Sequence, residues 1–252
     1  MKKLLSKALP NFLMKLLVKN RYKKQNIETH KQNIKNNRIV KIECSNIEKY
    51  NLLKEMLVKS FSGILNVKEH KFYFHPIAII KVPSSIDIYL KDIGAKSRNM
   101  NKKAEKSNIL CKIFDWNEKL DDIFEINNSS LGRQGREMDE AYIAYPKKVE
   151  NLNEKDFVIK YIGTFVNEKL VGYVESTLYI YGNFAMTNRI LGHKNYLKFG
   201  IMNLMIKKCV EFGIENNIEY INYLTMQNRK CNLLSAFKNR VGFREYSLKE
   251  MI

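Results

Sequence analysis

The clearest pattern of apolar and polar positions lies between residues 184 and 216, where a strand, a glycine-marked loop and a helix follow one another. The first part is strand-like, and residues 193–200 form a polar, basic loop. From Ile201 to Phe212 the apolar residues recur at helical spacing, with polar residues between them. We expect a helix that begins after Gly200 and ends before Gly213, which would form a left-handed cap.

The glycine at the start of this helix has two interpretations. A residue without a side chain lets backbone N–H groups approach an anion, and the helix dipole favours negative charge at that end. The strand, loop and helix could therefore hold a phosphate group. The alternative is an ordinary connection between a strand and a helix, because one glycine is a weak signal.

The first 37 residues differ from the rest in their pattern. Residues 1–20 place leucines among lysines and predict a basic amphipathic helix that is kinked near Pro10. Residues 21–37 are polar and rich in asparagine and lysine, which predicts a linker. The helix is too short and too charged to span a bilayer, and it lacks the features of a signal peptide. It could lie on an anionic membrane or dock on the protein itself.

The elements up to residue 107 are a strand at 38–44, a helix at 46–61, a strand at 71–82 with Pro76 as a bend or edge, and a helix at 84–106. From residue 109 the pattern predicts the order β-α-α-β-β-β-α-β-α-β. The expected elements are a strand at 109–114, helices at 117–128 and 138–149, strands at 157–166, 170–180 and 184–191, the helix at 201–212, a strand at 218–224, a helix at 232–241 and a strand from 243.

The composition is that of a folded protein. The chain has 252 residues, of which 45% are hydrophobic, with 11 glycines and four prolines, which is enough for one large domain or two small ones. The cysteines have no CxxC spacing, which is typical of reduced thiols in a cytoplasmic protein. No metal site is expected, because neither histidines nor cysteines show ligand spacing. These residues are Cys44, Cys111, Cys209, Cys231, His30, His70, His75 and His193.

The formal net charge is +18, and residues 1–37 supply half of it through nine lysines and one arginine against one glutamate. Such an excess favours an anionic partner: a nucleic acid, a membrane surface or a phosphate-rich substrate. The alternative is a surface that has become basic through a lysine-rich composition without function.

The predicted order of elements over residues 108–252 resembles the GNAT superfamily of N-acyltransferases. The stretch Leu197–Met202 is similar to the family's glycine-containing loop, with Gly200 in place, and Asn232–Phe243 is similar to the segment that ends in Gly-Phe. The resemblance implies a mixed, mostly antiparallel sheet with flanking helices, which is an α+β (mixed α/β) fold. It also implies acetyl-CoA or another acyl-CoA as donor, with no metal.

A second resemblance is to Fem-type aminoacyltransferases and related cell-envelope proteins. It rests on residues 96–106 (KSRNMNKKAEK), on Arg133–Arg136 and on residues 195–214. The Fem type doubles the GNAT fold and takes aminoacyl-tRNA as donor. Residues 1–107 are too short for a second unit of about 150 residues. We therefore expect a basic extension at 1–36, an accessory lobe at 37–107 and a GNAT-like domain at 108–252.

The GNAT resemblance also implies a donor site. The thioester would lie between splayed strands, with Ile190 and Leu191 on one side and Tyr223 and Leu224 on the other. The pyrophosphate would be held by backbone groups of Phe199, Gly200, Ile201 and Met202, with charge from Lys198. Alternatively, Lys198 is a solvated loop lysine. The cofactor-binding residues expected from the resemblance are Ile190, Leu191, Lys198, Phe199, Gly200, Ile201 and Met202.

Candidate catalytic residues are few. Glu175 lies within a run of apolar and aromatic residues, where burial would raise the pKa of its carboxyl and suit a general base. The alternative is a solvent-facing residue of an alternating strand. Tyr223 could protonate the leaving thiolate, or it could belong to the core. Arg133, Gln134 and Arg136 form a polar loop that could bind an anionic acceptor or pair with nearby acids.

These features predict an N-acyltransferase that moves an acyl group from acyl-CoA to an amine of an anionic acceptor, with a cell-envelope glycan precursor as one candidate. A first alternative is Fem-like transfer from aminoacyl-tRNA. A second is a non-catalytic GNAT-like module that binds RNA or membrane. We expect a cytoplasmic protein that could sit at the inner face of the membrane through residues 1–36.

Overall fold

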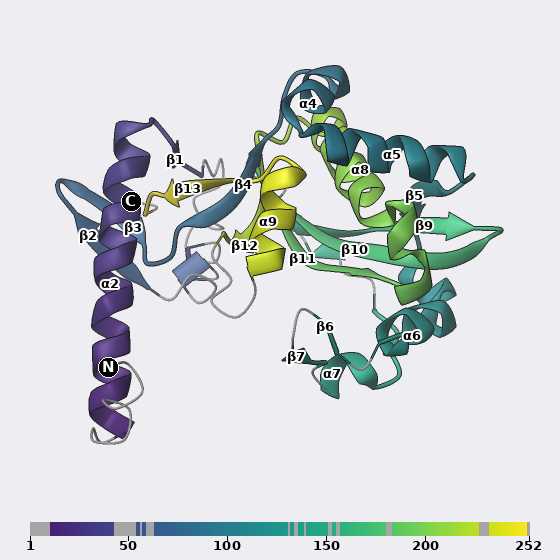
Figure 1. Ribbon diagram of the computed structural model, residues 1–252, viewed down its shortest axis with the longest axis horizontal. Helices are drawn as coiled ribbons and strands as arrows, with labels where there is room; N and C mark the ends of the chain where they lie inside the picture. The colour runs from purple at the N-terminus through teal and green to yellow at the C-terminus, as the bar shows by residue number, and fades with distance from the viewer. Residues whose placement is uncertain are drawn as a thin grey trace.

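The computed structural model describes residues 11–42, 54–55, 57–58, 63–130, 132–133, 136–138, 140–150, 153–154, 157–179, 183–226 and 232–250. These residues form a mixed α/β fold around a nine-stranded sheet, which is mostly antiparallel and has helices on both faces (Figure 1). The strand order is β1-β13-β4-β12-β11-β10-β9-β5, and β8 pairs with β9. The predicted fold class is confirmed.

The strands of the main sheet come from both ends of the chain. Their bounds are β1 (Ile39–Val40), β4 (Ile77–Lys81), β5 (Leu110–Phe114), β8 (Asn153–Glu154), β9 (Phe157–Val166), β10 (Lys169–Tyr179), β11 (Phe184–Gly192), β12 (Tyr220–Thr225) and β13 (Arg244–Leu248). Two small hairpins lie outside it: β2 (Ile64–Val67) with β3 (His70–Tyr73), and β6 (Gly132–Arg133) with β7 (Arg136–Glu137).

The helices divide between the two faces of the sheet. In Figure 1, α4 (Ile86–Asp92), α5 (Ala95–Lys106) and α8 (Ile201–Glu215) lie on one side, with α6 (Leu120–Asn128) and α7 (Glu140–Ile143) on the other. The helix α9 (Asn232–Arg240) connects β12 to β13, and α2 (Asn11–Lys35) lies at one end of the molecule. Two short 3₁₀-helices are η1 (Trp116–Glu118) and η2 (Lys194–Phe199).

The central meander of β9, β10 and β11 matches the sequence pattern within one residue or so at each end. The turn between β9 and β10 uses Asn167 and Glu168, both with positive φ, at 47° and 65°. Two consecutive left-handed residues match the twist of the strands that they join. The apolar side chains of this meander pack against α8 on one face and against α6 on the other.

Pro76 separates β3 from β4, so the bend expected there is confirmed. The helix expected at 84–106 is two helices, because Gly94 adopts an extended conformation between α4 and α5. The helix expected at 138–149 is wrong in extent: α7 covers only Glu140–Ile143, and residues 145–150 are irregular. The helix expected at 46–61 lies largely outside the described residues.

The expected end of the third helix is also corrected. Gly213 lies inside α8, which continues to Glu215, and Asn217 with φ of 54° follows the helix. A Cβ at Gly213 would lie 3.1 Å from the side chain of Ile221 and 3.2 Å from that of Val82. This glycine therefore permits close packing of α8 on the sheet and does not cap the helix.

The linker expected at 21–37 is wrong, because these residues form most of α2. The helix docks on β2 and β13 through polar side chains that are almost fully buried: Asn26, His30 and Asn33. His30 Nε2 donates to the carbonyl oxygen of Phe74 at 3.3 Å, and its Nδ1 accepts from Ser247 Oγ at 2.7 Å. The apolar pattern misses this helix because its buried face is made of amides and an imidazole.

The described residues of the accessory segment do not form a separate sheet. Strand β4 pairs with β12 on one side and with β13 on the other, and β1 pairs with β13. The main sheet therefore crosses the expected boundary between residues 107 and 108. Whether the two segments are independent units stays a prediction.

Candidate functional site

The candidate site begins where two parallel strands separate. Strands β11 and β12 pair only at Phe184–Tyr220, Ala185–Ile221 and Met186–Asn222. Beyond Met186, β11 runs on to Gly192 beside β10, while β12 runs on to Thr225 beside β4. The splay expected from the GNAT resemblance is therefore present in the structure.

A bulge in each strand explains the separation. In β11 the extra residue is Asn188, and in β12 the register against β4 shifts between Asn222 and Thr225. A bulge bends its strand and increases the local twist, so bulges at the same level direct the two strands apart. Leu224 within the second bulge has φ of 51°.

Asparagine side chains hold both bulges in place. Asn188 Nδ2 donates to Thr177 Oγ1 at 2.8 Å and to Glu175 Oε1 at 3.1 Å. Asn222, which is fully buried, donates to the carbonyl oxygens of Ala78 and Leu224 and accepts from the N–H of Leu224 at 3.0 Å. Backbone groups that the bulge removes from the ladder are thus satisfied by a side chain.

The separation leaves a cavity of about 360 Å³ between the strand ends, α8 and α9. This volume suits a small acyl or aminoacyl group, and the walls are mostly apolar. Four of the predicted residues line it, namely Ile190, Leu191, Met202 and Tyr223; Leu224 is not among the lining residues. The others are Ser130, Gly132, Lys194, Leu197, Leu233, Leu234 and Phe237.

A buried lysine stands behind the wall of this cavity. Lys238 of α9 is only 2% exposed, and its Nζ lies 4.2 Å from the ring centroid of Tyr223. The Nζ donates to the carbonyl oxygens of Tyr223 at 2.7 Å and Thr225 at 2.8 Å. Burial lowers the pKa of this amine to about 8. At neutral pH it is still mostly an ammonium.

Lys238 was not among the residues predicted from the sequence, although the sequence contains a signal for it. Leu234 and Phe237 of α9 and Val241, just past its end, recur at helical spacing as an apolar stripe and pack against the core. Lys238 occupies the remaining position of that stripe, where an apolar residue is usual. A lysine in an apolar stripe either extends its amine to solvent or is buried for a reason, and here it is buried.

Gly200 has a packing role in this structure. It follows η2 with φ of 88°, and a Cβ added there would overlap the carbonyl oxygen of Met100 in α5. Helix α5 therefore lies directly against the start of α8, where the phosphate-binding interpretation needs open space. Of the neighbouring predicted residues, Ile201 is fully buried and Lys198 is exposed, with its Nζ 5.2 Å from the ring centroid of Phe199.

Glu175 is not among the residues that line the cavity. Its Oε2 lies 3.6 Å from Arg189 Nε, and the Arg189 guanidinium lies 5.1 Å from the ring centroid of Tyr142. Burial, with a smaller contribution from Glu175, raises the pKa of Tyr161 to about 12. These residues form a polar cluster on the α7 side of the sheet, beside the cavity.

The predicted acceptor loop lies at the edge of the cavity. Gly132, which lines the cavity, pairs with Glu137, and Arg133 pairs with Arg136, so the loop is a short hairpin. Gln134 lies outside the described residues, as do the side chains of Arg133 and Arg136. Whether this hairpin binds an acceptor stays a prediction.

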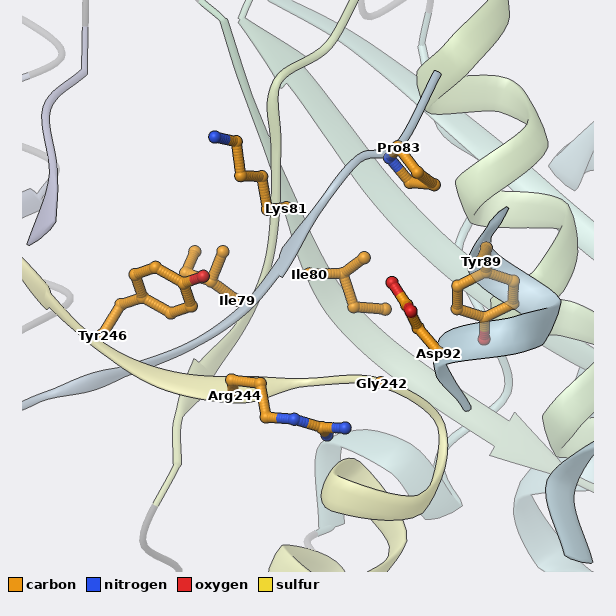
Figure 2. Close-up of a pocket in the computed structure, with 9 residues that line it drawn as sticks. All are labelled: Ile79, Ile80, Lys81, Pro83, Tyr89, Asp92, Gly242, Arg244 and Tyr246. Carbon is orange, nitrogen blue, oxygen red and sulfur yellow. The ribbon is translucent and has the colours of Figure 1, made fainter. Parts of the chain in front are cut away.

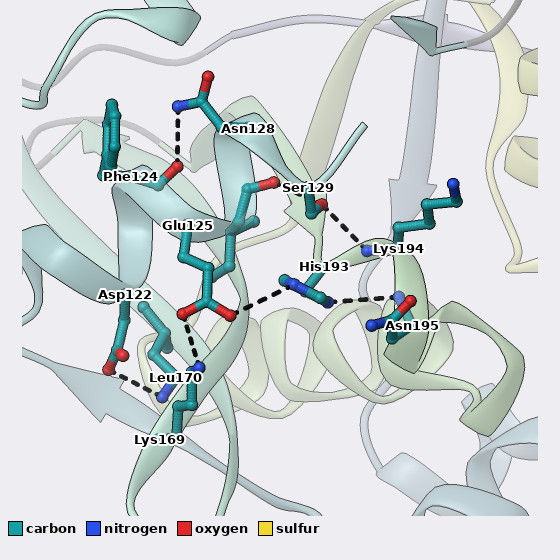
Figure 3. A network of polar contacts seen from close by, with 11 residues as sticks. Asp122, Phe124, Glu125, Asn128, Ser129, Lys169, Leu170, His193, Lys194 and Asn195 are labelled. Atoms are coloured by element: carbon teal, nitrogen blue, oxygen red, sulfur yellow. Dashed lines mark hydrogen bonds and ion pairs between the residues drawn. The ribbon is translucent and has the colours of Figure 1, made fainter. Parts of the chain in front are cut away.

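A polar network fixes α6 to the start of η2 at the same edge (Figure 3). His193 Nε2 lies 3.4 Å from Glu125 Oε1, and the other oxygen of Glu125 lies 2.6 Å from Lys169 Nζ. The backbone N–H of Lys194 donates to Ser129 Oγ at 3.0 Å. Because Lys194 lines the cavity, this network holds one side of its opening in place.

A second cleft of about 260 Å³ lies between β4, β13 and α4 (Figure 2). Lys81, Asp92 and Arg244 are its charged residues. None of the predicted site residues lines it. The full lining is Ile79, Ile80, Lys81, Pro83, Tyr89, Asp92, Gly242, Arg244 and Tyr246.

Two further observations bear on the expectations from composition. Cys111 and Cys209 are free thiols whose pKa values burial raises; Cys44 and Cys231 lie outside the described residues. Within the part of the chain that the structure describes, we find no helix with the length and apolar character needed to cross a bilayer.

No protein-family model and no curated protein matches the chain. Solved structures do match in fold. FemX is similar at a TM-score of 0.54 and 10% identity, over 79% of this chain and 67% of FemX.

L-PGS from Bacillus licheniformis is similar at a TM-score of 0.41 and 13% identity, over 59% of this chain and 44% of L-PGS. The C-terminal domain of a putative lysylphosphatidylglycerol synthetase from Agrobacterium fabrum is similar at a TM-score of 0.47 and 11% identity. The match covers 69% of this chain and 58% of that one. This chain thus spans about half the length of these last two structures. At such low identity, what is shared with FemX is the fold.

Proposed function

We propose that this chain, whose fold is that of FemX, is an aminoacyltransferase that moves an aminoacyl group from aminoacyl-tRNA to an amine. The observation that carries the proposal is the cavity between the splayed strands, with the buried ammonium of Lys238 behind its Tyr223 wall. The choice of donor is supported by the resemblance to Fem-type aminoacyltransferases and by the strongly basic charge of the chain.

Lys238 is suited to stabilise the negative charge of acyl transfer. When a nucleophile attacks an ester carbonyl, the carbonyl oxygen becomes an oxyanion. Two of the three N–H groups of Lys238 bind carbonyl oxygens of β12, which fixes Nζ behind Tyr223. We assign the third N–H to a substrate oxygen that reaches past the Tyr223 ring. A fixed cation in a site that excludes water stabilises an oxyanion far better than it would in water.

The proposed step keeps atoms and protons in balance. A neutral amine of the acceptor attacks the ester carbonyl carbon, and a C–N bond forms. The tetrahedral intermediate then collapses, the C–O bond to the terminal ribose breaks, and an amide remains on the acceptor. The proton lost by the amine goes to the departing ribose oxygen, so the products are the amide and uncharged tRNA.

The packing of α5 favours tRNA over acyl-CoA as donor. An acyl-CoA would place its pyrophosphate at the start of α8, where Gly200 is in contact with the backbone of Met100. An aminoacyl ester needs only its terminal ribose and amino acid at the cavity. The bulk of the tRNA can remain on the protein surface, where the positive charge lies.

The acceptor is proposed to enter beside the β6–β7 hairpin. Gly132 lines the cavity, and Arg133 and Arg136 belong to the same hairpin. A guanidinium binds a carboxylate or phosphate through two parallel hydrogen bonds, so these residues suit an acceptor that carries an anionic group next to its amine.

The test is a transfer assay with labelled donors. Total tRNA charged with labelled amino acids would be incubated with the full chain and a panel of acceptors: a peptidoglycan peptide, an amino-sugar phosphate and phosphatidylethanolamine. Amides survive mild alkali, whereas the ester to tRNA does not, so alkali-stable label on an acceptor reports transfer. Labelled acetyl-CoA is the parallel donor. Transfer from acetyl-CoA alone would contradict the proposal and support the acyl-CoA reading.

A further inference from the structure

We propose that the lysine face of α5, together with η2, is the surface that binds the phosphate backbone of the donor tRNA and leads its acylated end to the cavity. This inference rests on the proposed function, because it names the partner and where it lies. The lysines concerned are Lys96, Lys102, Lys103 and Lys106 of α5, and Lys194 and Lys198 of η2.

The four lysines of α5 share one side of the helix. At 100° per residue, they fall within an arc of about 120° and extend over roughly 15 Å of helix length. The opposite side carries Ser97, Asn101 and Ala104, all of them buried. The helix is therefore fixed on α8 by its small residues and presents a continuous ridge of positive charge.

One aromatic ring, that of Phe199, connects the lysines of α5 with those of η2. Lys103 Nζ lies 5.7 Å from the ring centroid of Phe199, and Lys198 Nζ lies 5.2 Å from the same centroid. The two ammonium groups thus lie near the same ring, although Lys103 belongs to α5 and Lys198 to η2. Phe199 is half-buried against α5 and α8, so its position is fixed by the core.

The same 3₁₀-helix reaches the cavity. Lys194 and Leu197 of η2 line the cavity, and Lys198 is the next residue. A polyanion bound along α5 would therefore meet Lys103, then Lys198, and then the opening at Lys194. This order suits a nucleic acid whose backbone is held outside and whose end enters the site.

The charge of this surface is not neutralised by its own acids. Glu105, the one acidic residue of α5, is bound to Lys207 of α8 at 2.7 Å. Within the described ranges, none of the six lysines takes part in an ion pair. The field of the patch is therefore available to a partner.

The features favour a nucleic acid over a lipid surface. A helix that binds a membrane inserts an apolar face below its charged one. The face of α5 opposite the lysines is packed on α8, and no large exposed apolar side chain belongs to α5. Lysines without an apolar face suit a soluble polyanion with regularly spaced phosphates.

The test compares two pairs of lysines. The double variant Lys103→Gln with Lys198→Gln removes the pair at Phe199. The matched control, Lys23→Gln with Lys24→Gln, removes the same charge from exposed positions on α2, at the opposite end of the molecule (Figure 1). Each full-length protein would be titrated with fluorescent total tRNA and with a short RNA hairpin ending in CCA, between about 50 and 200 mM salt.

We expect the Lys103 and Lys198 variant to lower the slope of log Kd against log salt by about 1.4 to 1.8, which is the loss of two phosphate contacts. The control pair should keep the wild-type slope. Equal losses in both pairs, or no loss in either, would overturn the proposal. The same proteins would also be titrated with phosphatidylglycerol vesicles. If the Lys103 and Lys198 variant loses binding to the vesicles but keeps its affinity for RNA, the proposal is also overturned.

Transfer kinetics separate this inference from the proposed function. With aminoacyl-tRNA as donor, the Lys103 and Lys198 variant should raise KM for tRNA and leave kcat nearly unchanged, since neither lysine is placed at the reacting atoms. If the chain transfers nothing but its RNA binding depends on this pair, the surface stands and the proposed function fails. If transfer occurs and the variant binds RNA as the wild type does, the surface is overturned.

Discussion

Two buried bases in this molecule have similar burial and different partners. His30 holds α2 against β13 and is fully buried; Lys238 lies behind the Tyr223 wall of the cavity and is 2% exposed. Desolvation lowers the pKa of both groups, to about 4 for His30 and to about 8 for Lys238. Neither pKa shift comes chiefly from a neighbouring charge, because in each case burial is the largest cause.

The partners explain why one site is structural and the other suits chemistry. His30 meets one acceptor, the carbonyl of Phe74, and one donor, the hydroxyl of Ser247, which together match a neutral imidazole. Lys238 meets two carbonyl oxygens and the face of a tyrosine ring, which all favour a cation. A buried base surrounded only by acceptors keeps its charge near neutral pH, and such a charge can stabilise an anion that forms nearby.

The largest expected effect follows from removing the charge at the cavity. Lys238→Met keeps the length and apolar stem of the side chain and removes the ammonium. We expect kcat for aminoacyl transfer to fall about 10²- to 10³-fold, which is the usual cost of losing one oxyanion donor. Circular dichroism and thermal unfolding should show a folded protein, because a desolvated amine is also removed.

The pH profile distinguishes this role from packing alone. Since the folded pKa of Lys238 is about 8, wild-type activity should fall as pH rises through that value. Stability should move the other way: the unfolded chain holds more protons than the folded one between pH 8 and the ordinary lysine pKa near 10.4, so unfolding becomes harder as pH rises there. An activity that stays constant through pH 8 would assign Lys238 to structure.

A smaller effect, on stability alone, is expected at His30. Its folded pKa of about 4 lies below the ordinary histidine value of 6.5, so the unfolded state binds more protons between these values. Stability is therefore complete above about pH 6.5 and is lost as pH falls towards 4, by on the order of 3 kcal/mol. Chemical unfolding at a series of pH values measures it. His30→Gln should lower stability at pH 7 and flatten this dependence; an equally steep dependence in the variant would assign the effect to other groups.

The smallest effect tests whether a buried polar side chain contributes to stability only when it is hydrogen-bonded. Asn33 Nδ2 donates to Ser247 Oγ at 3.1 Å, whereas both polar atoms of the Asn101 side chain lack a partner among the described residues. Asn33→Leu should cost about 1–2 kcal/mol, because it leaves a buried network incomplete. Asn101→Leu should be neutral or slightly stabilising by urea unfolding. Equal losses at the two positions would show that shape, and not hydrogen bonding, sets both values.

Much of the fold could be predicted from the sequence because its apolar pattern is strong in the meander and in α8. The pattern failed where polar side chains do the packing. The buried face of α2 consists of Asn26, His30 and Asn33, so hydrophobicity could not distinguish that helix from a linker. It also failed at α7, where the helix expected at 138–149 ends at Ile143, three residues before Pro146.

The candidate site was predicted only in part, because several of its features depend on contacts between residues that are distant in sequence. Ile190, Leu191 and Tyr223 were placed through a family resemblance, and the structure brings them to one cavity. The bulge at Asn188 depends on a hydrogen bond to Glu175 of β10, and Asn222 beside the bulge at Leu224 also binds Ala78 of β4. Such contacts between strands are not contained in the pattern of a single strand. The contact of Gly200 with α5 joins residues that are far apart in sequence.

The position of β4 has a consequence for the order in which the molecule can assemble. Its neighbours in the sheet, β12 and β13, are more than 130 residues further along the chain and are synthesised after it. Such a long loop must close before β4 gains its partners, which slows folding. Until then a strand of buried isoleucines has two open edges and is prone to associate with other chains. The cavity between β11 and β12 is therefore completed only after α9, which supplies part of its lining, has been synthesised.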